Sequence, residues 1–164
     1  MYTAQQFLDS IAHETRVCQH LATKVDPQQL DYRPVEGSRS TIELMRYLTW
    51  CVEAPVEALL NKDWSKVSQY AESTNEMTLE QFSEAMDQQL AKTKEWIGGI
   101  SEEEFMSRSA LMPWGAEVPL GAALVDTTLK FISAYRLQLF QYIKVCGATE
   151  LGTANAWLGV DAPA

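Results

Sequence analysis

The sequence predicts an all-α protein, a four-helix bundle with short extra helical turns in its connections. Four long segments repeat apolar residues every three or four positions, which is the spacing of one buried helix face. Strand-like alternation extends no further than the five residues AEVPL. The 164 residues suffice to bury a core, so we expect a single domain over residues 1–164.

The first helix is expected to begin at Thr3, because Gln6 follows three residues later in a capping-box pattern. The Asp26-Pro27 pair marks its end. Its apolar face comprises Leu8, Ile11, Thr15, Cys18, Ala22 and Val25.

The second helix is expected to begin at Ser40, with Glu43 completing a capping box. Pro55 lies inside its apolar pattern and removes one backbone donor, so we expect a kink or break near residues 51–54. A polar linker with possible short turns follows over residues 61–77. The face comprises Ile42, Met45, Thr49, Val52, Val56 and Leu59.

The third helix is expected to begin at Thr78, with Gln81 three residues later, and to end at Gly98-Gly99. Ser101 and the three glutamates after it indicate another, short helix. The face of the third helix comprises Leu79, Phe82, Met86, Leu90, Thr93 and Ile97.

The fourth helix is expected over about residues 122–146, with Gly147 directly after its end. We expect the tail that carries Trp157 to dock in part on the bundle. The face of the helix comprises Leu124, Thr128, Phe131, Tyr135, Leu139, Tyr142 and Cys146.

The amino-acid composition limits the classes of binding partner that this protein can have. The net charge of −9, without a basic cluster, argues against a nucleic-acid partner and against an anionic membrane surface. No apolar run is long enough to span a membrane, and the first ten residues lack the pattern of a secretory signal. Three cysteines far apart in the sequence fit a reducing compartment, so we expect a cytoplasmic protein with buried thiols.

Residue types that usually carry catalysis or bind metal are sparse. His13 and His20 are seven residues apart beside the apolar face of the first helix, so boundary positions are expected for both. We predict no catalytic residue, no cofactor-binding residue and no metal ligand. The plentiful carboxylates are interpreted as solvated, and these include Glu53, Glu57, Glu84 and Asp87.

Two motifs resemble the DinB-like family of bacterial four-helix-bundle proteins. "STIELMRY" is similar to the family pattern S-x-x-E-L-x-x-H through Ser40, Glu43 and Leu44. "AYRLQLFQYIKVCG" is similar to the pattern H-x-x-x-H-R-G-Q-L, followed by Y-L-R and a glycine. The residues that match the second pattern are Arg136, Gln138, Leu139, Tyr142, Ile143, Lys144 and Gly147, whereas Leu137 replaces a glycine.

This resemblance implies a central cavity in which family members commonly hold a divalent metal, nickel or zinc, on three histidines. Here Tyr47, Phe131 and Tyr135 occupy the three histidine positions. Phenol and phenyl groups are poor ligands for these metals compared with imidazole. We therefore predict no cofactor and a metal site rebuilt as core, with Tyr47, Phe131 and Tyr135 as the candidate pocket.

Glu43, Arg136 and Gln138 are then interpreted as a polar framework. A buried arginine requires an acidic or carbonyl partner, and our hypothesis for Arg136 is Glu43.

The function expected is that of a metal-free protein, a homodimer, that binds a small molecule or interacts with a partner. The alternative is a thiol or small-molecule transferase of the DinB-like type, with or without a metal. Tyr47 and Tyr135 distinguish the two, because an enzyme that uses them loses turnover when either becomes phenylalanine. Tyrosines that only fill space would affect stability alone.

Overall fold

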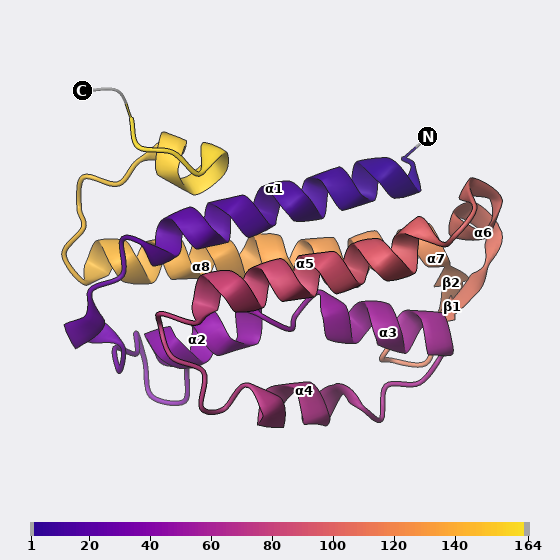
Figure 1. The fold of residues 1–164 in the computed structure, drawn as a ribbon. Helices are drawn as coiled ribbons and strands as arrows, with labels where there is room; N and C mark the ends of the chain where they lie inside the picture. Colours follow the sequence, from indigo (N-terminus) through magenta and orange to yellow (C-terminus); the bar gives the residue numbers. More distant parts are fainter. Residues whose placement is uncertain (1, 163–164) are drawn as a thin grey trace.

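The computed structural model describes residues 2–162 and confirms the all-α four-helix bundle (Figure 1). Residues 1, 163 and 164 of the expected domain lie outside this range. The long elements are α1 (Ala4–Ala22), α2 (Thr41–Leu48) followed by α3 (Glu53–Asn61), α5 (Phe82–Gly98), and α7 (Leu120–Leu124) continuing through the π-helical turn η2 (Val125–Leu129) into α8 (Lys130–Val145).

The chain path through the bundle includes one crossover. α1 and α8 run in one direction, and α2, α3 and α5 run in the other (Figure 1). The polar linker with α4 (Val67–Ser73) passes along the outside of the bundle and joins the parallel helices α3 and α5. α4 has no buried residue, so few apolar contacts hold it in place.

Helix caps confirm three of the predicted starts. Thr3, Ser40 and Ser101 each form a complete capping box with the residue three positions later. Ser101 begins the short helix α6 (Glu102–Ser107). The predicted start at Thr78 is wrong, because residues 78–81 form a turn and α5 begins at Phe82. There the Gln81 side chain accepts from the Thr78 N–H, which is only half of a capping box.

Small elements fill the connections. The 3₁₀ turn η1 (Pro27–Gln29) follows α1, and the π-helical turn η3 (Ala154–Leu158) closes the tail. Strands β1 (Ser109–Leu111) and β2 (Glu117–Pro119) pair antiparallel, with Ala110 opposite Val118. β2 lies within AEVPL, the longest stretch of strand-like alternation in the sequence.

The break expected from Pro55 occurs at residues 49–52, between α2 and α3. The side chain of Gln89, on α5, bridges this break. Its Oε1 accepts from the N–H groups of Val52, at 2.8 Å, and Glu53, at 3.2 Å, while its Nε2 donates to the carbonyl of Leu48 at 2.9 Å. Gln89 is 1% exposed, so it satisfies buried backbone groups that water does not reach.

The fourth helix buries part of its predicted face. Leu124, Thr128, Leu139 and Tyr142 are buried as predicted, whereas Phe131, Tyr135 and Cys146 are only half-buried. The π-helical turn η2 inserts an extra residue, and positions beside the predicted face are buried as well, among them Thr127, Ile132, Arg136 and Ile143. Sequence periodicity assumes a regular 3.6-residue helix and cannot locate such an insertion.

Arg136 is the largest side chain in the fully buried core, at 1% exposure. Its Nε donates to Glu14 Oε2 of α1 at 2.5 Å, and its Nη1 donates to the carbonyl of Ala156 in η3. The guanidinium also lies 4.6 Å from the ring centroid of Trp157. One residue thus connects α8, α1 and the tail, and confirms the expected docking of the tail.

The hypothesis that Glu43 is the partner of Arg136 is wrong. Glu43 caps α2 by accepting from the Ser40 N–H. Its carboxylate also accepts hydrogen bonds from both terminal nitrogens of Arg33, at 2.6 and 2.8 Å. The sequence pattern could require an acceptor for Arg136 but could not rank Glu14 over Glu43, because both acids are far from Arg136 along the chain. Within the described part of the chain, no helix has the length and apolar character to cross a membrane.

The two carboxylates should contribute unequally to the stability of the fold. Glu14→Gln leaves the buried Arg136 guanidinium without its counter-charge and should lower the free energy of unfolding by about 3–5 kcal/mol. Glu43→Gln keeps the cap and removes an exposed ion pair, so its cost should be at most about 1 kcal/mol. Urea unfolding at pH 7, followed by circular dichroism, measures both, and equal losses would contradict this assignment.

Candidate functional site

Tyr47 and Tyr135 lie together, as the resemblance implies, but Phe131 is not part of their cluster. The Tyr47 ring contacts the rings of Tyr135 and Trp50, each with a centroid distance of 4.6 Å. The Arg39 guanidinium covers this pair, 4.2 Å from the Tyr47 centroid and 5.5 Å from that of Tyr135. The result is an aromatic cluster under a cation.

These residues do not fit a divalent metal. Phe131 has no donor atom, and a guanidinium lies over both tyrosine rings, where it repels a second cation. Burial raises the pKa of Tyr47, so its hydroxyl stays protonated. Over residues 2–162, no group of three or more His, Cys, Asp or Glu side chains is placed to hold a metal ion.

The remaining framework residues position Arg39. Gln138 Nε2 donates to the Tyr142 hydroxyl at 2.5 Å, and that hydroxyl donates to the Arg39 carbonyl at 3.2 Å. Arg39 directly precedes the Ser40 cap of α2. α8 therefore fixes the backbone from which the Arg39 side chain extends. The Arg33 guanidinium and the Ser40 N–H lower the pKa of Glu43 to about 2, so Glu43 is a carboxylate already committed to other partners.

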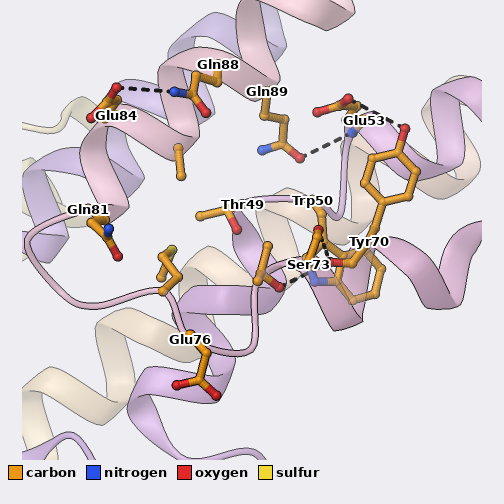
Figure 2. Close-up of a pocket in the computed structure, with 13 residues that line it drawn as sticks. Thr49, Trp50, Glu53, Tyr70, Ser73, Glu76, Gln81, Glu84, Gln88 and Gln89 are labelled. Atoms are coloured by element: carbon orange, nitrogen blue, oxygen red, sulfur yellow. Dashed lines mark hydrogen bonds between the residues drawn. The ribbon is translucent and has the colours of Figure 1, made fainter.

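Two hollows open beside this cluster, between the bundle and the linker with α4. The smaller one, the basic hollow, has a volume of about 320 Å³. The larger one, the acidic hollow, has a volume of about 620 Å³ (Figure 2). Trp50 and Thr74 line both hollows, which we together call the α4 cleft. The basic hollow is lined by Arg39, Glu43, Arg46, Tyr47, Trp50, Ala71, Thr74 and Asn75.

The acidic hollow has three carboxylates and no cation among its lining side chains. Glu53, Glu76 and Glu84 come from three different elements around it, with Gln81, Gln88 and Gln89 between them (Figure 2). The Tyr70 ring lies next to Glu53, and Trp50 lines the same hollow farther from that carboxylate (Figure 2). Such a surface favours a ligand group that is positively charged and rich in N–H donors.

Glu53 and Glu57 are half-buried rather than solvated, which corrects the interpretation from the sequence. Burial, and secondarily the charge of Glu57, raises the pKa of Glu53, while Lys92 and the Tyr70 hydroxyl oppose this shift. The Tyr70 hydroxyl donates to Glu57 Oε2 at 2.8 Å and to Glu53 Oε1 at 3.5 Å. The long second bond leaves Glu53 largely available to a ligand. Glu84 and Asp87 are exposed, as expected.

The three thiols offer no nucleophile. Cys18 and Cys51 are buried, and burial raises the pKa of both. Cys146 is half-buried rather than buried as expected, and its partial burial and the charge of Asp26 raise its pKa. A thiolate is the reactive form of cysteine, so none of these side chains is activated at neutral pH.

The histidines occupy boundary positions on α1, as expected. His13 Nε2 lies 2.7 Å from the Trp157 carbonyl, and His20 Nε2 lies 3.1 Å from the Asn155 side chain. Both therefore help to hold the tail. The sequence did not single out Arg39, Trp50, Tyr70 or Gln89; only the buried backbone groups that Pro55 must free could have indicated that a residue such as Gln89 was needed.

Glu53→Gln should stabilise the protein at neutral pH. The folded-state pKa of Glu53 lies above its unfolded value near 4.3, so the folded state loses stability as the pH rises through the folded pKa. A neutral amide avoids this loss, and because the carboxylate is partly exposed the gain should be below about 1 kcal/mol. Thermal unfolding of Glu53→Gln and wild type at pH 4 and pH 7 measures the effect. The difference should shrink at pH 4, whereas a pH-independent difference, or one equal to that of the exposed Glu84→Gln, would contradict it.

Comparison with known proteins agrees on the fold. No protein-family model and no curated protein matches the sequence. A DinB-like protein from Bacillus subtilis has a similar structure, with a TM-score of 0.68 at 20% identity over 90% of this chain and 96% of that one. A putative DinB family member from Exiguobacterium sibiricum gives a TM-score of 0.70 at 21% identity, over 93% and 98% of the two chains. The chain therefore has the DinB-like fold over most of its length, as its two motifs predicted.

Proposed function

We propose that the protein binds a small organic molecule in the α4 cleft. The observation that carries this proposal is the cleft itself, about 620 Å³ in its larger part, lined mainly by polar and aromatic side chains beside the Tyr47 cluster. Pockets for small ligands commonly have volumes of 300–1,000 Å³ and a few convergent polar groups.

The construction of the cleft supports binding. Its inner wall is the α2–α3 break, which the buried Gln89 fixes to α5. Its outer wall is the linker, whose helix α4 has no buried residue. A fixed inner wall orients a ligand, and a weakly packed outer wall can move to admit it.

A transferase of the DinB-like type is the second candidate. The raised pKa values of the three thiols and of Tyr47 argue against covalent or base catalysis by these side chains. Tyr47 can still act as a hydrogen-bond donor to a ligand. We therefore favour binding over catalysis. Tyr47→Phe tests this choice: if the wild type turns over a thiol or small-molecule substrate and the variant does not, the protein is an enzyme.

A variant that fills the cleft tests the site. Gln88→Trp places an indole at an exposed α5 position that lines the acidic hollow. The matched control, Ala91→Trp, adds the same group at an exposed α5 position that does not line it. A metabolite library is screened by thermal shift, and each hit is measured by calorimetry. Gln88→Trp should weaken every true ligand at least tenfold and Ala91→Trp should not, whereas equal affinities for both would place the site elsewhere.

We also propose a cytoplasmic homodimer. Three cysteines without a disulfide suit a reducing compartment. Large apolar side chains are exposed on α8 and on the tail, and a second subunit could cover them. They are Leu137, Val145, Trp157, Leu158 and Val160.

Light scattering coupled to size exclusion tests the dimer. The wild type should elute with twice the mass of one chain. Leu137→Glu places a charge in the exposed apolar surface and should yield a monomer of unchanged helix content. Val35→Glu, a control at an exposed apolar residue in the connection between α1 and α2, should remain dimeric. A monomeric wild type would refute the proposal.

A further inference from the structure

We infer that the ligand of the α4 cleft is a small zwitterion, such as an amino acid or a short peptide, with its carboxylate in the basic hollow and its ammonium group in the acidic hollow. This inference rests on the proposed function and specifies the chemistry of the same site.

The basic hollow suits a carboxylate. Among residues 2–162, no acidic side chain forms an ion pair with Arg39, whose guanidinium is oriented only by its stacking on Tyr47 and Tyr135. Arg46 lines the same hollow and uses its Nε to donate to the Met77 carbonyl at 2.9 Å, which leaves its terminal nitrogens for a ligand. The lining carboxylate, Glu43, is already paired with Arg33 outside the hollow. Two guanidinium groups thus face a small hollow without a counter-charge of their own.

The acidic hollow suits an ammonium group. Glu53 is half-buried, and its nearest polar side-chain partner is the Tyr70 hydroxyl at 3.5 Å. Tyr70 lies beside this carboxylate, and Trp50 lines the same hollow farther from it (Figure 2). A carboxylate with an aromatic ring beside it attracts an organic cation by charge and by cation–π contact. The backbone N–H of Glu53 is held by Gln89, so this position is fixed.

An aromatic path joins the two ends. Arg39 stacks on Tyr47, Tyr47 contacts Trp50 edge to face, and Trp50 lines both hollows. A ligand that lies along Trp50 places its apolar middle on the indole and reaches both charged ends. No single charge satisfies this site: a pure anion meets the carboxylates and the net charge of −9, and a pure cation meets Arg39 and Arg46.

A series of blocked ligands tests the inference. The probes are L-alanine, dialanine, trialanine and 6-aminohexanoic acid, each also N-acetylated and each also as its C-terminal amide, with affinities measured by calorimetry at pH 7. At least one zwitterion should bind, and both of its blocked forms should bind at least tenfold more weakly. The chain length that binds best reports the separation of the two charged ends.

Two variants assign the ends. Arg39→Met should weaken the preferred zwitterion at least tenfold but leave the affinity of its C-terminal amide unchanged. Glu53→Gln should do the same while leaving the affinity of the N-acetyl form unchanged. Lys94→Met and Glu103→Gln, charge changes at exposed positions outside the cleft, should have no effect.

The outcomes separate this inference from the proposed function. The zwitterion would be overturned, and the binding site kept, by either of two results. In the first, the blocked forms bind as tightly as the zwitterions. In the second, no zwitterion binds at 1 mM while Gln88→Trp weakens the binding of a ligand from the library. If neither the series nor the library yields a ligand sensitive to Gln88→Trp, both the inference and the proposed function fail.

Discussion

The break in the second long helix is the constraint on which the site depends. Pro55 cannot donate a backbone hydrogen bond, so the helix turns at residues 49–52 and exposes backbone groups inside the bundle. Buried groups of this kind cost about 1–3 kcal/mol each when unpaired. Gln89 pairs three of them from α5, and the turn that results directs Trp50 and Glu53 into the α4 cleft. Helix packing and the candidate site therefore share one cause.

A second buried polar device holds the opposite side of the bundle. Arg136 donates to Glu14 and to the Ala156 carbonyl, and its guanidinium packs against the Trp157 ring. An ion pair of this kind adds little over an apolar core, because desolvation offsets most of the attraction. The ion pair does specify how α8 packs against α1 and the tail, since an apolar side chain in place of Arg136 would have no directional contact with either. The arginine that matches the family motif is thus structural and distant in role from the α4 cleft.

The tyrosines at the positions where the resemblance implies histidines support a cation in this chain. Tyr47 and Tyr135 contact each other, and the Arg39 guanidinium lies over both rings. Phe131, one turn before Tyr135 on α8, is half-buried and is not among the rings that contact Tyr47. The basic hollow beside Tyr47 and the acidic hollow beside Glu53 give the cleft two opposite ends, an arrangement suited to recognition by charge rather than by coordination.

The four long helical segments, three helix caps, the Pro55 break and the need of Arg136 for an acceptor were predictable from the amino-acid sequence, because these follow from local spacing and from backbone chemistry. The start of α5 and the π-helical turn could not be predicted from the sequence, since both depart from the regular helix geometry that a periodicity argument assumes. Only the tertiary structure decided that Glu14 rather than Glu43 pairs with Arg136, and that Arg39, Trp50, Tyr70 and Glu53 line one cleft. Those pairings join residues from elements far apart along the chain, and no local pattern fixes which of several suitable side chains will meet.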